Sequence, residues 1–312
     1  MTSVPVVDIL GYGLDESNEG EVTTDALQTI GDDMCRALRD IGFCYIRNHG
    51  IPQSLIDQVN TVSRTFFEKS VEYKTKYQRK PTTGIHGWMP RGSEGLNPER
   101  PPDNKEAFNI TPLDEAEQLP DVSGFDVAVK DLREACHVLS LRILDLMSVG
   151  LHLEDRHFFR KCHKSIAERN STTTLRVLYY PALSSDAEMK ANQIRCGEHS
   201  DFGSLTLLFQ DDVGGLEVRT TEGEYISASP IPGTILINIG DMMQRWTSDK
   251  LLATKHRVLI PEDEIKKRKS RQSIAFFVVP DNDVMIQSLD KSAKYEPISS
   301  LQFLQQRLAS SY

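Results

Sequence analysis

His199 and Asp201 form an HxD pair, a spacing that can hold a metal ion. In an extended segment the side chains at positions i and i+2 leave the same face of the strand, so one imidazole and one carboxylate can bind the same ion. A second histidine, His256, begins the later segment HRVLIP. Two histidines and one carboxylate on one face of an octahedral metal leave three positions open, as oxygen chemistry at non-haem iron requires. Catalytic zinc accepts the same ligand types, so these residues predict a metal site without selecting the metal.

Arg271 and Ser273 form a second pair with the same spacing, shortly after His256. A guanidinium can bind a carboxylate with two parallel hydrogen bonds while a neighbouring hydroxyl donates a third. Tyr180, near the end of the segment LRVLYYP, can offer its phenol to the same anion. An HxD pair alone also occurs by chance, but next to this anchor it predicts a site for an oxo-acid that chelates the metal.

The second half of the chain has the pattern of an all-β fold. From Thr174 onward, short apolar or alternating runs are separated by turn residues. Six or more such strands predict two packed sheets, as in a sandwich or jelly roll, which would bring His256 opposite the HxD pair. The runs are LRVLYYP, SLTLLFQ, LEVRT, TILINIG, HRVLIP and SIAFFVVP.

Helices are predicted on both sides of this β region in the sequence, so the expected fold class is mainly β with flanking helices. The start is expected to alternate as strand, helix, strand, helix, and the Pro- and Gly-rich residues 80–125 are expected to be irregular, lid-like loops. We expect one structural unit with three parts: an N-terminal α/β region, a scaffold helix with the β core, and a terminal helix. Their bounds are 1–125, 126–298 (with the helix at 126–150) and 299–312.

Composition excludes several classes of function. The chain has 312 residues and a net charge of −9, so no nucleic-acid partner is expected, and the basic run at 266–269 is typical of a solvated turn. No apolar stretch approaches the ~20 residues that span a bilayer, and no secretory signal begins the chain, which predicts a cytoplasmic protein without a membrane partner. Oligomeric state is not indicated. A disulfide framework is not expected from five widely spaced cysteines without a CxxC pair, Cys35, Cys44, Cys136, Cys162 and Cys196.

With these motifs in place, the sequence resembles the isopenicillin N synthase-like group of Fe(II)/2-oxoglutarate dioxygenases over almost its entire length. The order and spacing of the HxD, distal His and RxS elements make the resemblance specific. The matching stretches are PVVDI, DIGFCYIRNHGIP, KEAFNI, LRVLYYP, GEHSDFGSLTLLFQDDVGGLEV, IPGTILINIGDMMQRWTSDKLLATKHRVLIP and RQSIAFFVVP.

The resemblance implies a double-stranded β-helix (jelly-roll) core that binds Fe(II), 2-oxoglutarate and O2, with ascorbate as a candidate reductant. It implies that a C–H bond of a small-molecule metabolite is oxidised by hydroxylation, desaturation or oxidative cyclisation, with succinate and CO2 as coproducts. The implied iron ligands are His199, Asp201 and His256. The implied cosubstrate ligands are Arg271, Ser273 and Tyr180.

One position departs from the family pattern, because many plant members have Asn two residues before the tyrosine where this chain has Leu178. Some relatives keep the RxS pair without using 2-oxoglutarate, so an iron oxidase of the same fold is one alternative. A zinc hydrolase is a second, although it gives no reason for Arg271 and Ser273. A silent protein that binds a small acid is a third, and the intact metal and anchor residues argue against it.

The substrate pocket is expected to be mostly apolar, with one strong cation, Arg176. Such a pocket suits a small carboxylate or an amino-acid-derived metabolite. Residues 84–88 are a candidate lid. By resemblance, the residues expected to line the pocket are Phe108, Arg176, Leu178, Phe202, Trp246 and Phe277.

Overall fold

The computed structural model describes residues 3–14, 23–80, 84–94, 102–112, 118–183, 194–260, 268–292 and 294–309. Of the basic run, Lys266 and Lys267 lie outside these residues. No helix in the described part of the chain is long and apolar enough to cross a membrane. All five cysteines are free thiols.

The N-terminal segment alternates as predicted: β1 (Val6–Asp8), α1 (Thr24–Asp40), β2 (Phe43–Arg47) and α2 (Gln53–Phe67). Helix α1 begins after Thr23, whose hydroxyl accepts a hydrogen bond from the amide of Ala26. Gly42, with φ of 74°, reverses the chain directly before β2. A Cβ at Gly42 would lie 2.2 Å from the carbonyl oxygen of Leu252, so only glycine fits this turn.

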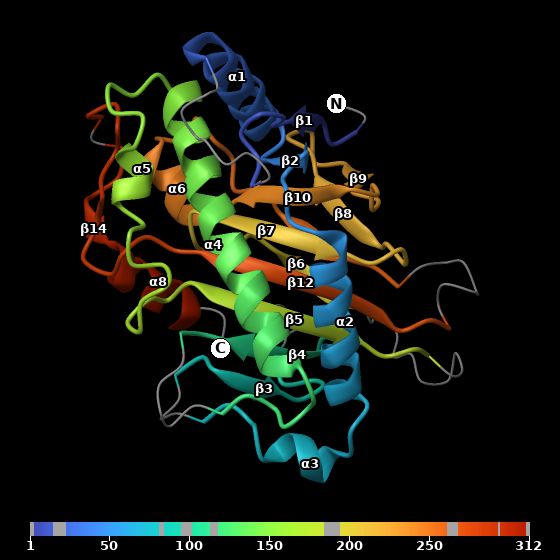
Figure 1. Ribbon diagram of the computed structural model, residues 1–312. Coiled ribbons are helices and arrows are strands. Elements are labelled where there is room, and N and C mark those ends of the chain that lie inside the picture. The colour runs from blue at the N-terminus through green and yellow to red at the C-terminus, as the bar shows by residue number, and fades with distance from the viewer. Residues whose placement is uncertain are drawn as a thin grey trace.

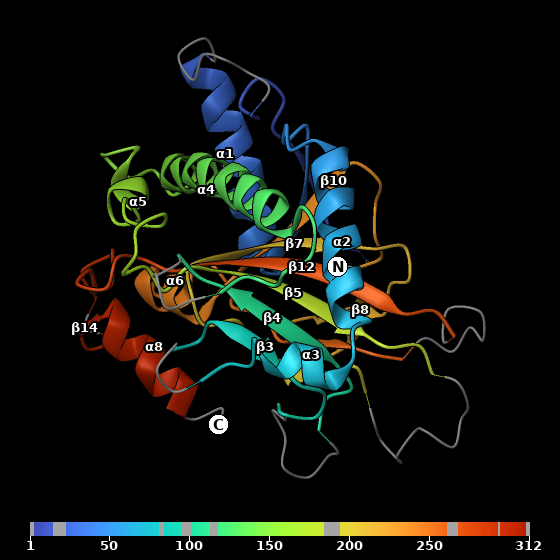
Figure 2. The ribbon, with the colours of Figure 1, turned by 60° about the horizontal axis from the view of Figure 1, so that its bottom comes forward.

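The core of the molecule is an eight-stranded sheet in the order β1-β2-β10-β7-β12-β5-β4-β3. Strands from the first 125 residues therefore pair with strands of the second half in one sheet. Helices α1 and α4 lie on one side of this sheet and α8 on the other (Figures 1 and 2). The new elements are β3 (Gly87–Met89), β4 (Glu106–Ile110), α4 (Phe125–Gly150), β5 (Thr174–Tyr180), β7 (Leu205–Gln210), β10 (Thr234–Ile239), β12 (Arg271–Val278) and α8 (Ser300–Ala309).

A second sheet, in the order β6-β11-β8-β9, completes the jelly-roll core. A buried cluster between the sheets joins residues such as Leu178 and Ala275 of the large sheet to Cys196 and Val258 of the small one. The mainly β fold class predicted from the sequence is thus confirmed. These strands are β6 (Cys196–His199), β8 (Leu216–Arg219), β9 (Tyr225–Ser227) and β11 (His256–Val258).

Strand alternation decides which side chains enter this interior. On β12, Ile274 and Phe276 pack in the core between the sheet and the helices, whereas Ala275 packs in the cluster between the two sheets. Arg271 and Ser273 share the parity of Ala275, as strand geometry requires. The sheet therefore presents its anchor residues to the jelly-roll interior.

Residues 80–125 differ from the expected irregular loop, because β3 and β4 lie within them. Strand β4 pairs with β5 along its whole length, from Glu106 opposite Tyr179 to Ile110 opposite Leu175. Pairing with a distant strand here overrides the local Pro and Gly signals. Other short elements not predicted are α3 (Val71–Thr75), α5 (Phe158–Lys161), α6 (Asp241–Trp246), β13 (Met285–Ile286) and β14 (Ile298–Ser299).

Candidate active site

The HxD pair and the distal histidine meet at one end of the jelly roll. Antiparallel pairing of β6 and β11 sets His256 directly opposite His199. Asp201 follows in the turn after β6, and its Oδ1 lies 3.9 Å from Nε2 of His199 and 3.8 Å from Nε2 of His256. The three ligand atoms all lie within 4.8 Å of one another, which suits a single metal ion.

Hydrogen bonds orient each of these side chains toward the same point. The carbonyl of Gly197 lies 2.8 Å from Nδ1 of His199, and the carbonyl of Thr254 lies 3.1 Å from Nδ1 of His256. A carbonyl only accepts, so each Nδ1 carries the proton and each Nε2 keeps its lone pair for a metal. This donor set therefore fits a divalent cation.

The remaining oxygen of Asp201 is held by two donors from the large sheet. Its Oδ2 accepts hydrogen bonds from Thr206 Oγ1 at 2.6 Å and Asn238 Nδ2 at 2.7 Å, which leaves Oδ1 directed at the histidines. Burial opposes ionisation of Asp201, but the two histidines and these bonds hold its pKa below the ordinary value. Burial, and then the neighbouring His199, lowers the pKa of His256 to about 4, so this imidazole is neutral at pH 7.

We predict that Thr206→Val weakens Fe(II) binding by roughly 10- to 100-fold, the usual effect of removing a hydrogen bond to a metal ligand. The valine keeps the shape of the side chain but leaves Asp201 Oδ2 with the single donor Asn238. Anaerobic titration with Fe(II) measures the effect, and Thr206→Ser, which keeps the hydroxyl, is the control. Equal affinity of the Val and Ser variants would contradict the prediction.

Arg271 lies fully inside the protein, with 1% of its surface exposed. Its guanidinium donates to the carbonyl of Gly214 at 3.0 Å and to Oγ of Ser273 at 3.2 Å, and it lies 4.9 Å from the ring centre of Tyr180. Pairing of Arg271 with Tyr180 across β12 and β5 brings the predicted anchor residues together. In the described part of the chain no carboxylate oxygen lies within 4.0 Å of this guanidinium, so its buried charge is available to an anion.

A second buried cation, Arg195, was not predicted from the sequence. It is 2% exposed and its guanidinium lies 6.0 Å from the ring centre of the same Tyr180. Burial, followed by the positive charge of Arg271, lowers the pKa of Arg195 to about 10. Among the described residues its Nη1 has no hydrogen-bond partner. Two guanidiniums around one phenol strengthen the case for an anion here.

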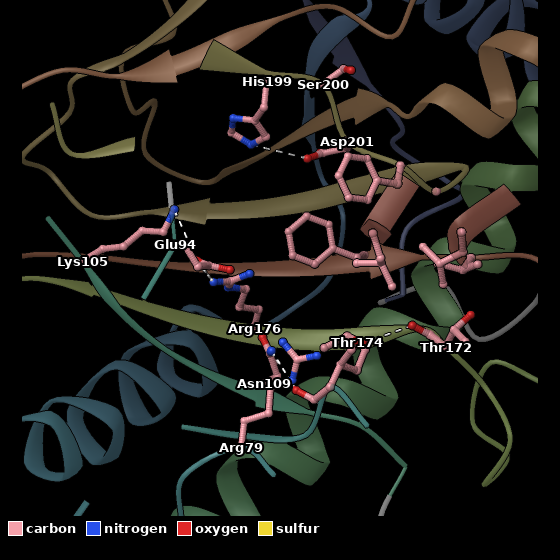
Figure 3. A pocket seen from close by; sticks show the side chains of 17 residues that line it. Arg79, Glu94, Lys105, Asn109, Thr172, Thr174, Arg176, His199, Ser200 and Asp201 are labelled. Atoms are coloured by element: carbon pink, nitrogen blue, oxygen red, sulfur yellow. Dashed lines mark hydrogen bonds and ion pairs between the residues drawn. The ribbon is translucent and has the colours of Figure 1, made fainter. Parts of the chain in front are cut away.

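A cavity of about 170 Å³ opens beside the metal-binding side chains. Figure 3 shows His199 and Asp201 at one end and Arg176 with Asn109 at the other. Arg176 forms an ion pair with Glu94, which lies 3.5 Å from the ammonium of Lys105. The apolar part of the wall is formed by Ile85, Phe202, Phe277, Val279, Leu304 and Leu308.

Three residues predicted for the substrate pocket, Arg176, Phe202 and Phe277, line this cavity. Ile85, from the candidate lid, also lines it, while Gly87 begins the edge strand β3. The single strong cation expected in the pocket is instead part of a charge network, because Glu94 and Lys105 accompany Arg176. These partners are in the loop region, where the sequence shows no pattern that would identify them.

The other three predicted residues lie elsewhere. Phe108 faces the helices, with its ring 5.2 Å from that of Phe66, because its neighbour on β4, Asn109, takes the cavity side. Trp246 packs against Phe159 at 5.2 Å in the same core. Leu178 is buried between the two sheets and is not among the cavity-lining residues.

Comparison with known proteins agrees with this site. Residues 171–280 match the family described as the 2OG-Fe(II) oxygenase superfamily, and residues 4–126 match the N-terminal region of non-haem dioxygenases in morphine synthesis. Proline hydroxylase buaE of Petromyces alliaceus is 35% identical, covering 88% of this chain and 91% of its own. The 2-oxoglutarate-dependent dioxygenase htyE of Aspergillus rugulosus is 32% identical, covering 96% of this chain and 98% of its own.

Solved structures give the same result. A full-length Neurospora crassa protein, crystallised in complex with alpha-KG and thymine, has a TM-score of 0.85 and 27% identity, covering 99% of this chain and 97% of that protein. Its complex with alpha-KG alone also has a TM-score of 0.85, with 28% identity, covering 98% of this chain and 96% of that protein. The similarity thus extends through the N-terminal elements as well as the jelly roll.

Proposed function

Because this chain belongs to the 2OG-Fe(II) oxygenase superfamily, whose members use Fe(II), 2-oxoglutarate and O2, we propose that it hydroxylates a small nitrogen-containing metabolite. One oxygen atom of O2 enters a C–H bond of the substrate, and the other enters 2-oxoglutarate, which leaves as succinate and CO2. The observation that carries the proposal is the cluster of His199, Asp201 and His256 at the wall of a cavity that ends in Arg176 and Glu94.

His199, Asp201 and His256 would hold the iron, which when bound supplies the activation of oxygen. The protein contributes orientation. Two imidazoles and one carboxylate would give the bound divalent ion a net charge of +1, and the hydrogen bonds at each Nδ1 and at Asp201 Oδ2 keep these side chains in place.

Arg271, Ser273 and Tyr180 would hold the far carboxylate of 2-oxoglutarate. The guanidinium and the serine hydroxyl are already 3.2 Å apart and can both donate to one carboxylate group. The positive charge of Arg195 adds to the attraction. The side chain of Leu178 carries no hydrogen-bonding group, so Arg271, Ser273 and Tyr180 are the residues that we expect to bind this carboxylate.

The substrate would lie in the cavity beside Phe202 and Phe277, with its polar group at Arg176 and Glu94. A simple carboxylate must compete with Glu94 for Arg176, whereas a molecule with both an acceptor and an N–H donor satisfies both charges. Amino acids and cyclic amides have this pattern. The relatives named as proline hydroxylase and as a homoarginine hydroxylase, and the neighbour bound to thymine, support this choice.

The test is turnover of 2-oxoglutarate labelled with ¹⁴C at the carboxyl carbon next to the keto group, the carbon that leaves as CO2, with free amino acids and cyclic amides as candidate substrates. We expect release of ¹⁴CO2 to rise with one of these compounds, whose mass increases by one oxygen atom. Release of CO2 that rises with simple carboxylates only would overturn the proposed substrate class.

We predict that Arg176→Leu raises KM for the substrate by roughly 10- to 100-fold, since a hydrogen bond to a charged group contributes about 1.5–3 kcal/mol. The affinity for 2-oxoglutarate should stay within a factor of two or so, because Arg176 lies opposite Ala275, four residues along β12 from Arg271. Kinetics with each compound varied in turn give both constants. An unchanged KM for the substrate would remove Arg176 from substrate binding.

A further inference from the structure

A group of buried charged side chains lies against the strand that carries His199. Asp103 is 4% exposed, and its Oδ1 accepts a hydrogen bond at 3.0 Å from the backbone amide of Gly197, two residues before His199. Its Oδ2 accepts a hydrogen bond from Lys105 Nζ at 2.6 Å. Asp103 thus connects the loop before β4 to β6.

Gly197 links this carboxylate to the metal-binding histidine. Its amide is held by Asp103, and its carbonyl accepts the 2.8 Å hydrogen bond from Nδ1 of His199. Glycine has the most permissive backbone of any residue, so its own torsion preferences do little to fix the direction of this carbonyl. The hydrogen bond that the Gly197 amide donates to Asp103 therefore restrains a residue that has no side chain to restrain it.

Lys105 keeps this carboxylate in place. The ammonium lies 2.6 Å from Asp103 and 3.2 Å from Sγ of Cys196, and it is 7% exposed. Burial disfavours the ammonium, but the adjacent sulfur of Cys196 and the carboxylates of Glu94 and Asp103 raise the pKa of Lys105 above its usual range. Lys105 and Asp103 therefore stabilise each other, because removal of either partner would leave an uncompensated buried charge.

We propose that Asp103 is a positioning residue for the metal site, which restrains Gly197 and thereby aims Nε2 of His199 at the iron. The inference rests on the proposed function only in assigning the metal to His199, Asp201 and His256. Asp103 is not among the residues that line the cavity, and Lys105 lines it beside Glu94. Their effect is on metal affinity and on the geometry of one of the two histidines, because His256 is held separately by Thr254.

The test is a matched pair of full-length variants, Asp103→Asn/Lys105→Met and Asp103→Leu/Lys105→Met. Both remove the ion pair, so their charges are equal, and Asn and Leu have nearly the same shape. They differ in whether an oxygen remains to accept the bond from Gly197. Anaerobic titration with Fe(II) gives the dissociation constant. The Co(II) form gives the absorption spectrum of the metal and the shifted NMR signals of the two Nδ1 protons.

We expect the Leu variant to bind Fe(II) about 10-fold more weakly than the Asn variant, the lower end of the effect of losing a direct partner of a metal-binding histidine, because Asp103 acts through Gly197. The Nδ1 signal of His199 should change and that of His256 should not. If the Leu variant does not fold, Asp103→Ala/Lys105→Met replaces it and must show the same loss.

Equal Fe(II) affinity and equal Co(II) spectra in the pair would overturn the role of Asp103. That result leaves the proposed function intact as long as the unmodified protein binds Fe(II) and turns over 2-oxoglutarate. A failure of the unmodified protein to bind Fe(II) would instead contradict the proposed function.

Discussion

Asp201→Ala should reduce turnover by on the order of 1000-fold or more, which is below detection. A metal ion contributes several kcal/mol of catalysis, and each 1.4 kcal/mol is a factor of about ten. Asp201 is the only carboxylate of the His199, Asp201 and His256 group. Its loss leaves two neutral imidazoles, which bind a divalent cation weakly. The expected cause is therefore loss of Fe(II), which metal analysis and anaerobic titration measure directly.

Asp155→Asn is the matched control for the lost charge. Asp155 lies on the surface and pairs with Lys161, and its replacement by Asn should change Fe(II) affinity and turnover by less than about twofold. Asp201→Ala should not unfold the apo-protein, because the change removes a buried carboxylate that, among the described residues, lies within 4.0 Å of two imidazoles and of no lysine or arginine. Normal turnover with Asp201→Ala would rule out the metal site assigned here.

The metal site shows how far sequence spacing can predict a structure. The HxD spacing predicted that His199 and Asp201 bind one ion, although β6 ends at His199 and Asp201 lies in the turn that follows. The proximity of His256 needed only that two strands of a jelly roll pair. The structure supplies that pairing as His199 opposite His256. Alternation was enough to place Arg271 and Ser273 on one face of their strand, whereas the pairing of β12 with β5, which brings Tyr180 beside them, is supplied by the structure.

The substrate end of the cavity could not be predicted in the same way. Phe108 and Asn109 are adjacent on β4, and which of them faces the cavity depends on the register of β4 against β5, which the sequence does not state. Glu94, Asp103 and Lys105 come from a loop region without periodicity. Their positions follow from contacts with β5 and β6, which are far away in the sequence.

Arg271→Met should raise the dissociation constant for 2-oxoglutarate by on the order of 30- to 1000-fold, because loss of one partner of a buried charged hydrogen bond costs about 2–4 kcal/mol. Methionine keeps much of the length and volume of arginine but donates no hydrogen bond. Ser273→Ala removes one neutral donor and should cost only about tenfold or less. Anaerobic titration of the Fe(II) protein with 2-oxoglutarate separates the two.

The thermal stability of Arg271→Met distinguishes a binding role of Arg271 from a structural one. Without 2-oxoglutarate, the guanidinium of Arg271 is buried among neutral acceptors, the carbonyl of Gly214 and the amide oxygen of Gln210. Removing this buried charge recovers its desolvation cost but leaves the Gly214 carbonyl without its donor, so Arg271→Met should change the Tm of the apo-protein little. Added 2-oxoglutarate should raise the Tm of the unmodified protein and not that of the variant. A lower Tm with undiminished affinity for 2-oxoglutarate would show that Arg271 supports the fold instead, and that the cosubstrate carboxylate is held by other residues.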